Sequence, residues 1–182
     1  MTSTADRVIE TGDGAGAGSA ALKLFRKWGE TGLGRWLCSR LICWQAPYFA
    51  SIAPELQSLE PGRCVATIKH RRRIQNHIGT VHAIALCNLA EFVGGLATDA
   101  AMTRSQRWIP KGMTVRYLKK AIGPMRAEAS LETIGDIGSG TQRIASVLVK
   151  DGSMETVFSA EIAMWVSPKP AETRKTDPAR TD

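Results

Sequence analysis

The sequence has little of what marks several common classes of protein. Only 6% of its 182 residues are aromatic, and its four cysteines form no Cys-x-x-Cys pair. The first twenty residues lack the apolar core of a secretory signal. The basic residues form no long stripe interleaved with aromatics. We therefore expect reduced, buried cysteines in a cytoplasmic protein, with no bound metal and no nucleic-acid partner.

What the sequence does contain is enough apolar material for one folded domain. Hydrophobic residues make up 43% of the chain, and the formal net charge is +7. A basic balance fits an anionic lipid or a phosphorylated small ligand such as coenzyme A. The composition predicts a single domain over residues 20–168, between a disordered leader (1–19) and a disordered tail (169–182).

Residues 20–46 have an amphipathic helical pattern in which leucine and tryptophan are mixed with lysine and arginine. The pattern pauses at residues 29–34, and Pro47 ends it. A basic helix with tryptophan and leucine can lie on a membrane surface. The alternative, which we favour, is that this N-terminal helical extension packs on the domain that follows it.

The segments after this extension predict strands and one long helix. Strands are expected from residue 64 to about residue 73 and at 113–119, 126–133, 142–150 and 156–166, with the helix at about 80–102. Asp151 and Gly152 predict a hairpin between the last two strands. Consecutive strands without helices between them pair antiparallel, and a single helix covers one face of their sheet. The predicted fold class is therefore α+β.

The predicted central helix is apolar on both sides. The face expected to pack on the sheet consists of His82, Ala85, Leu86, Leu89, Val93, Leu96 and Ala100. The opposite face consists of Ile84, Cys87, Glu91, Gly94, Gly95 and Thr98. Adjacent glycines lower helix propensity, so we expect a partner backbone or a ligand to approach closely there. A membrane span is disfavoured by four polar residues within the helix, His82, Asn88, Glu91 and Asp99.

Glu91 is the residue from which function is best inferred. A carboxylate on an apolar, buried helix needs either compensation or a purpose. One interpretation is that backbone donors, or an arginine such as Arg104 or Arg116, satisfy the carboxylate. The other is that Glu91 is a general base or nucleophile whose pKa is tuned by its enclosed position. Burial alone does not separate these interpretations.

The segment before Glu91 reads Asn76-x-x-Gly79-Thr80-x-His82, and Glu91 ends a Leu-Ala-Glu sequence nine residues after His82. This pattern resembles the hotdog-fold acyl-CoA thioesterase superfamily, and its PaaI-like group in particular. Those proteins carry Asn-x-x-Gly-Thr-x-His-Gly-Gly, followed by Leu-Ala-Asp or Leu-Ala-Glu on the central helix. The resemblance covers roughly residues 54–166. It implies an antiparallel sheet wrapped around one long helix, here with an extra N-terminal helix.

The resemblance also implies roles for the residues of the pattern. Glu91 would attack the thioester or activate water, and Asn76 would orient the substrate or that water. His82 would either take part directly or hold the loop at the helix start. Backbone N–H groups near His82 and Ala83 would polarise the thioester carbonyl. Positions expected to contact the substrate are Gly79, Thr80, Ala83 and Gly95.

The sequence departs from the family pattern at Ala83 and Ile84, where relatives have two glycines. Ala83 can still donate its N–H, but the added side chains narrow the pocket. Thr114 is a candidate for the second polar group that some relatives supply after the helix. The phosphates of coenzyme A would be met by Arg116, Lys119 and Lys120. These three residues are alternatively a charged strand edge that resists pairing.

Helical geometry divides the predicted site into two halves. At about 1.5 Å per residue, His82 and Glu91 are about 13 Å apart and cannot both touch one thioester. A two-fold dimer can bring the loop of one chain to the Glu91 of another. We therefore predict a homodimer, or a dimer of dimers, that hydrolyses an acyl-CoA or acyl carrier protein thioester, with no cofactor beyond the coenzyme A of the substrate. The alternatives are an acyl-ligand-binding protein without turnover and, less favoured, a hydratase or dehydratase.

Overall fold

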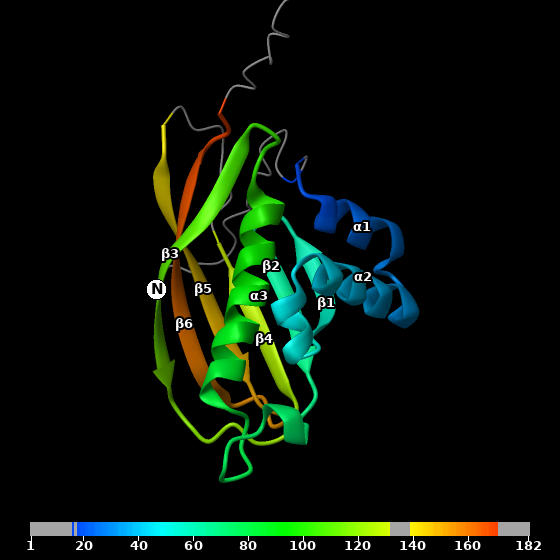
Figure 1. Cartoon of the computed structure of the whole chain (residues 1–182), viewed down its shortest axis with the longest axis vertical. Helices are drawn as coiled ribbons and strands as arrows, with labels where there is room; N and C mark the ends of the chain where they lie inside the picture. Colours follow the sequence, from blue (N-terminus) through cyan, green and yellow to red (C-terminus); the bar gives the residue numbers. More distant parts are fainter. Residues whose placement is uncertain (1–15, 17, 132–138, 171–182) are drawn as a thin grey trace, which may run out of the picture.

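The computed structural model describes residues 16, 18–131 and 139–170 (Figure 1). The predicted leader and tail lie outside these residues, apart from positions 16, 18, 19, 169 and 170. The chain forms one sheet, a long helix across it, and a helical layer beside one edge (Figure 1). This arrangement confirms the predicted α+β class.

Each of the six strands of the sheet is antiparallel to its neighbours. In chain order the strands are β1 (Glu55–Glu60), β2 (Arg63–Ile68), β3 (Gln106–Tyr117), β4 (Met125–Ser130), β5 (Thr141–Lys150) and β6 (Thr156–Pro168). Their order across the sheet is β1-β2-β4-β5-β6-β3. The sheet therefore has β1 at one edge and β3 at the other.

The four strands after the long helix and the hairpin between the last two are confirmed, although β3 begins at Gln106 rather than at residue 113. Asp151 holds the hairpin turn, because its carboxylate accepts hydrogen bonds from the backbone N–H groups of Ser153 and Glu155. Two expectations are wrong. The sequence pattern did not predict β1, and β2 ends at Ile68 rather than near residue 73 because a 3-10 turn (η2, Arg72–Ile74) follows it.

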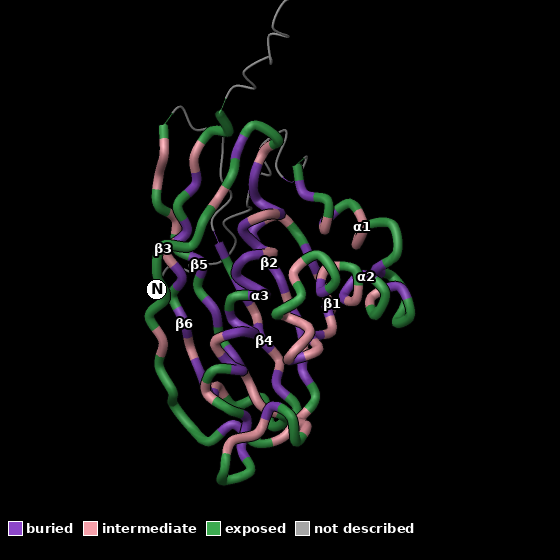
Figure 2. Tube along the Cα trace, in the orientation of Figure 1, coloured by how far each residue is buried: buried purple, intermediate pink, exposed green. Residues whose placement is uncertain are grey.

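The long helix α3 (Ala83–Ala101) lies across one face of the sheet and supplies much of the core (Figures 1 and 2). It contacts all six strands, so most of its residues are buried. By length and composition α3 could cross a membrane, but 67% of that apolar window is buried inside the molecule. Such burial is typical of a core helix.

The sheet surrounds more of α3 than the sequence predicted. Gly94 was expected to face away from the sheet, but a Cβ there would lie 2.8 Å from Cδ1 of Ile162 on β6. Thr98 is fully buried and donates a hydrogen bond to the Gly94 carbonyl at 2.7 Å. Leu96, expected on the sheet face, is only half-buried. The close approach predicted at Gly94 is therefore made by the chain's own sheet.

Two helices and a 3-10 turn precede β1 in the chain and cover the β1 edge of the sheet (Figure 1). They are α1 (Ala20–Trp28), α2 (Gly32–Gln45) and η1 (Pro47–Ser51). The hydroxyls of Ser19 and Thr31 cap the two helices by accepting backbone N–H bonds in the first turn. Ser39 on α2 accepts a hydrogen bond from the backbone N–H of Leu56 on β1 at 2.8 Å. The favoured prediction, that this extension packs on the domain, is confirmed.

The opposite edge of the sheet is open. Most residues of β3 are exposed (Figure 2). Pro110 and a bulge between Pro110 and Gly112 interrupt the register with β6 halfway along the strand. The open edge therefore has two separate segments whose backbone groups can meet another strand.

Candidate functional site

Asn76 holds the loop that leads into α3. Its Oδ1 accepts hydrogen bonds from the backbone N–H groups of Ile78 and Thr80, each at 3.1 Å. Its Nδ2 donates to the Thr80 hydroxyl at 2.7 Å. Gly79 has a φ of +80°, which other residues rarely adopt. Asn76, Gly79 and Thr80 thus fix the shape of the loop, and their contact with a substrate stays a prediction.

His82 caps the start of α3. Its Nδ1 accepts a hydrogen bond from the backbone N–H of Ile84 at 3.1 Å, which corresponds to the loop-holding role of the two predicted for this histidine. The N–H of Ala83 has no acceptor among the described residues and lies at the positive end of the helix. The start of α3 therefore presents one free backbone donor, beside an Ile84 side chain that is 56% exposed.

Glu91 lies farther along α3 and is exposed in the single chain. The prediction that this carboxylate is buried is wrong for one chain, because Glu91 lies on a stripe with Ile84 and Cys87 that the sheet and the N-terminal helices leave partly open. Within the residues that the structure describes, Glu91 forms no hydrogen bond or ion pair. The predicted ion pair of Glu91 with Arg104 or Arg116 is therefore not formed among the described residues.

Glu91 lines a cleft of about 310 Å³ between α3 and the N-terminal helices. Most of the other walls are apolar and include Ala21, Ile42, Ala46, Phe49, Phe92, Leu96 and Trp108. The rings of Phe49 and Phe92 meet edge to face, with centroids 5.3 Å apart. Gly95 also lines the cleft, and a Cβ on it would lie 3.0 Å from the Trp108 ring. The absent side chain at Gly95 therefore makes room for Trp108.

His82 lines a different hollow from Glu91. This second hollow, of about 340 Å³, is bounded by η1, η2 and the first turns of α3 and includes Tyr48, Arg73 and Ile84. The separation agrees with the helical spacing, which predicted that one chain cannot bring His82 and Glu91 to the same thioester. In a single chain, Glu91 and His82 thus line two separate hollows.

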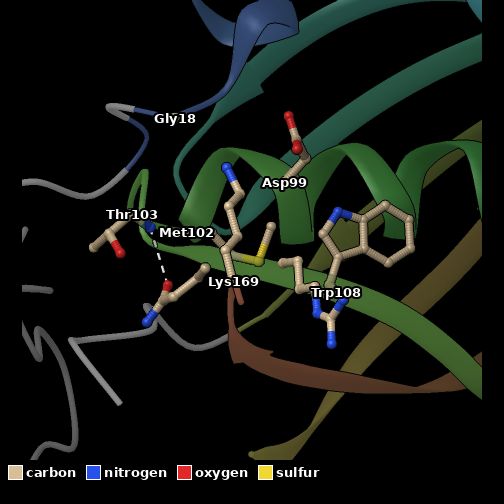
Figure 3. A pocket seen from close by; sticks show the side chains of 8 residues that line it. Gly18, Asp99, Met102, Thr103, Trp108 and Lys169 are labelled. Atoms are coloured by element: carbon tan, nitrogen blue, oxygen red, sulfur yellow. Dashed lines mark hydrogen bonds between the residues drawn. The ribbon is translucent and has the colours of Figure 1, made fainter. Parts of the chain in front are cut away.

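A third hollow, of about 230 Å³, adjoins the Glu91 cleft at the end of α3 (Figure 3). Asp99 and Trp108 line both spaces, and Arg107 and Lys169 add positive charge to the third. Asp99 accepts a hydrogen bond from the Ser19 hydroxyl. The two carboxylates of the cleft therefore differ, since Asp99 is engaged and Glu91 is not.

The three basic residues predicted to meet coenzyme A do not line the Glu91 cleft of their own chain. Arg116 pairs with Ser159 in the β3–β6 register, which places its side chain on the sheet face away from α3. Lys119 forms an exposed ion pair with Glu155 at 2.8 Å, and Lys120 is exposed. Thr114 shares the outer face with Arg116. Their contact with coenzyme A stays a prediction.

Cys87 and Tyr117 connect the exposed stripe of α3 with the open strand β3. The Cys87 Sγ and the Tyr117 hydroxyl oxygen are 3.3 Å apart. This hydrogen bond, together with partial desolvation, raises the pKa of Tyr117 to about 12. Other exposed apolar side chains lie on β3 and just after it, namely Ile109, Met113, Leu118 and Ile122. The stripe and β3 form one exposed, partly apolar surface, here called the β3 face.

The remaining cysteines are buried and free, as predicted. Burial raises the pKa of the Cys38, Cys43 and Cys64 thiols, which keeps them neutral. Across residues 16, 18–131 and 139–170, no three His, Cys, Asp or Glu side chains lie close enough to hold a metal ion.

Several solved structures with this arrangement are named as thioesterases. The chain aligns with PA5026 of Pseudomonas aeruginosa, a protein of unknown function described as a probable thioesterase, at 24% identity and a TM-score of 0.65, over 73% of this chain and 95% of that one. It aligns with the thioesterase HI1161 of Haemophilus influenzae at 14% identity and a TM-score of 0.62, over 73% and 90%. The fold is therefore the hotdog fold, as predicted.

A more similar solved structure is that of the structural-genomics protein APC5556. It is 39% identical, with a TM-score of 0.72, over 83% of this chain and all of that one. The sequence model of the family described as Domain of unknown function (DUF4442) matches residues 34–166. The chain belongs to this family. No functionally curated protein matches the sequence.

The sequence alone did not reveal the walls of the Glu91 cleft. Ile42 comes from α2, Ala46 is the residue that ends it, Phe49 comes from η1 and Trp108 from β3. The four-residue spacing of Ile42 and Ala46 does indicate one side of a helix. No local pattern links that side to Trp108, because the contact exists only once β3 lies beside β6.

Proposed function

We propose that this protein hydrolyses acyl-CoA or acyl carrier protein thioesters at a composite site between two chains. The observation that carries the proposal is Glu91, a carboxylate without a partner among the described residues at the wall of an apolar cleft. The names of PA5026 and HI1161 support the same chemistry. In this proposal the cleft takes the acyl chain, Glu91 is the reactive group, and the second chain supplies the start of its α3.

Glu91 acts as a general base or as a nucleophile. As a base, its carboxylate takes a proton from water while the water oxygen attacks the thioester carbonyl carbon. Negative charge develops on the carbonyl oxygen, where the backbone N–H of the partner's Ala83 stabilises it. The C–S bond then breaks, and the thiolate takes up the proton. As a nucleophile, the Glu91 carboxylate instead attacks the carbonyl carbon, the C–S bond breaks, and the thiolate leaves and takes a proton from solvent. Water then hydrolyses the resulting anhydride, which releases the carboxylic acid and regenerates Glu91.

The β3 face supports a two-fold dimer as the assembly. A second β3 strand added to the open edge continues the sheet and satisfies backbone groups that are otherwise unpaired. It also places both α3 helices on the same face of the joined sheet. The exposed stripe with Glu91 then faces the partner. In this dimer the second chain would enclose the Glu91 carboxylate, as the sequence predicted. Asn76 is a positioning residue here, because it holds the loop that carries the Ala83 donor.

A panel of acyl-CoA thioesters, with detection of the released thiol, tests the proposal. Glu91→Gln is expected to lower kcat by about 10²–10⁴-fold, since an amide neither accepts the proton nor attacks the carbonyl. Glu161→Gln is the matched control, because Glu161 is exposed on the outer face of the sheet. Turnover by the wild type that survives Glu91→Gln unchanged would overturn the role of Glu91.

One observation favours a second candidate, acyl-ligand binding without turnover. The N–H of Ile84 is already bonded to His82, so the helix start has fewer free donors for an oxyanion. This candidate predicts acyl-CoA binding by calorimetry with no thiol release. It also predicts that the double variant Ala83→Gly/Ile84→Gly, which restores the family glycines, gains measurable turnover.

A further inference from the structure

The outer side of the N-terminal helices carries a continuous apolar stripe. On α2 and η1, Trp44 is 83% exposed, Leu33 is 75% exposed and Tyr48 is 71% exposed. Leu37 and Leu41 are exposed between them, at the three- and four-residue spacing that aligns side chains along one side of a helix. These five residues are here called the outer stripe. Trp36 flanks it and is also exposed.

Within the described part of the chain, the hydrophobic core does not include the outer stripe, although Tyr48 at its end also lines the hollow that contains His82. The opposite side of α2 already packs on the domain through Cys38, Ser39 and Cys43, which are buried, and Ser39 bonds to the backbone of β1. α2 is thus apolar on two sides, and among the described residues only one of these sides packs on the domain. An exposed apolar surface of this extent marks an interaction site.

The helical extension that carries the outer stripe is positively charged. Residues 20–51 contain five basic residues and one acidic residue. Lys23, Arg26 and Lys27 are exposed along α1, and the Lys27 ammonium lies 5.6 Å from the centroid of the Trp28 ring. Within the described part of the chain, none of these basic residues pairs with a carboxylate. Apolar residues with tryptophans, flanked by cations, match an anionic bilayer surface.

The position of the helices leaves this surface free in the proposed dimer. Figure 1 shows α1 and α2 beyond β1, whereas β3 is at the far edge of the sheet. The inner sides of the same helices wall the Glu91 cleft through Ala20, Ala21, Ile42 and Ala46. The helices therefore separate the cleft from the surface that carries the stripe.

We propose that α1 and α2 dock on an anionic lipid bilayer, with the outer stripe at the acyl-chain boundary and the basic residues of α1 at the headgroups. A second copy of the chain fits less well, because two such surfaces would bring like charges together. Docking would hold the Glu91 cleft next to the lipid phase. Docking is independent of the chemistry at Glu91, so a variant that no longer docks can still hydrolyse thioesters, and an inactive variant can still dock.

Sedimentation with vesicles tests the docking. The full-length protein is expected to bind phosphatidylglycerol–phosphatidylcholine vesicles more tightly than pure phosphatidylcholine vesicles, with a blue shift in tryptophan fluorescence. Binding should weaken as salt is raised. Leu33→Ser/Trp44→Ser should weaken it by roughly tenfold or more. The matched control is Leu148→Ser/Trp165→Ser, which changes the same residue types at exposed positions on β5 and β6.

Charge is tested separately by Lys23→Gln/Arg26→Gln/Lys27→Gln, against the equal charge change Lys69→Gln/Arg72→Gln/Arg73→Gln elsewhere. Only the first triple variant should reduce binding to anionic vesicles. The proposal is overturned if the wild type does not bind anionic vesicles at low salt, or if the outer-stripe variant binds as well as its control. It is also overturned if the outer-stripe variant changes the oligomeric state, since the stripe would then be a protein–protein contact.

Discussion

A single amide, that of Asn76, determines where α3 starts. Its side chain bonds to two backbone N–H groups and one hydroxyl of the loop, and Gly79 supplies the left-handed backbone that closes the turn. This loop positions the free N–H of Ala83. At the residue scale, the architecture of the site thus depends on hydrogen bonds within five consecutive residues.

Asn76→Ala should therefore destabilise the fold by about 1–3 kcal/mol, because it leaves the N–H and hydroxyl of buried Thr80 without partners. His77→Ala, at an exposed position in the same loop, should change stability by no more than about 0.5 kcal/mol. Urea unfolding of both variants measures the difference. Equal stability of the two would show that the loop is held by other contacts.

Glu128 gives a prediction for pH. The hydrogen bond from Arg126, at 3.0 Å, and the charge of Lys150 hold the pKa of Glu128 below its ordinary value. A lowered folded-state pKa adds stability above the unfolded-state pKa, and this stability is lost as pH falls through the folded-state pKa. Glu128→Gln should cost less than about 1 kcal/mol at neutral pH, because the group is partly exposed.

Urea unfolding of wild type and Glu128→Gln from neutral to acid pH checks this sign. The two curves should converge as the pH falls. Glu60→Gln, on an exposed carboxylate at the end of β1, controls for a general loss of charge. A difference that persists in acid would mean that packing, rather than charge, makes Glu128 stabilising.

At the scale of elements, the corner between α1 and α2 depends on a glycine. A Cβ at Gly34 would lie 1.7 Å from the backbone carbonyl oxygen of Trp28, so no small side-chain shift could accommodate it. Gly32, at the start of the same helix, has only an arginine side-chain nitrogen within 4 Å of such a Cβ. The close approach of the Trp28 carbonyl therefore requires a glycine at position 34, whereas no close contact requires one at position 32.

Gly34→Ala should cost at least about 1–3 kcal/mol through overpacking, whereas Gly32→Ala should be neutral or slightly stabilising. Hydrogen exchange should show faster exchange in α1 for Gly34→Ala alone, since α1 would lose its place beside α2. Because α1 supplies Ala20 and Ala21 to the Glu91 cleft, the variant also measures how far the cleft depends on the helical layer. Unchanged hydrogen exchange in α1 would contradict the claim that α1 packs beside α2 only when residue 34 is glycine.

The elements that were predicted correctly are those with a strong local pattern. In β6 the buried residues Phe158, Ala160, Ile162 and Met164 alternate with more exposed ones, and α3 combines length with apolar content. β1 was missed because Glu55–Glu60 contains no β-branched or aromatic residue. Its pairing with β2, rather than its own propensity, makes it a strand.

The candidate site was predictable only where its residues are close in the sequence. The loop at residues 76–82 and the position of Glu91 on α3 follow from spacing. Spacing does not predict that Glu91 is exposed or that Gly94 packs against β6. Both features depend on how far the sheet curves around α3. Trp108 could not be assigned to the cleft, since a contact between β3 and the N-terminal helices is tertiary.

At the scale of the whole molecule, the β3 face makes oligomeric state a direct test. Met113 lies on β3, is 38% exposed and pairs with Ile162 in the register, on the side of the sheet that carries α3. Met113→Arg would place two like charges near the two-fold axis of the proposed dimer and should weaken it by tenfold or more. Ile144→Arg, exposed on β5, is the matched control.

Sedimentation velocity over a range of concentrations distinguishes these variants. The wild type and Ile144→Arg should sediment as a dimer at micromolar concentration, and Met113→Arg should dissociate. If hydrolysis needs both half-sites, thiol release should fall together with the dimer fraction. A wild type that is monomeric at these concentrations would exclude the composite site.

The hydrogen bond from Leu56 to Ser39 has a consequence for solubility. Sheets with two bare edges can grow without limit, as amyloid does, because each added strand exposes another edge. Here α2 shields β1 and uses one of its backbone donors, so among the described strands the edge open to association is that of β3. Two chains joined at β3 leave no bare edge for a third, and assembly through the sheet ends at a pair. The N-terminal helices would thus prevent growth of the sheet into fibres, because they block the addition of strands at β1.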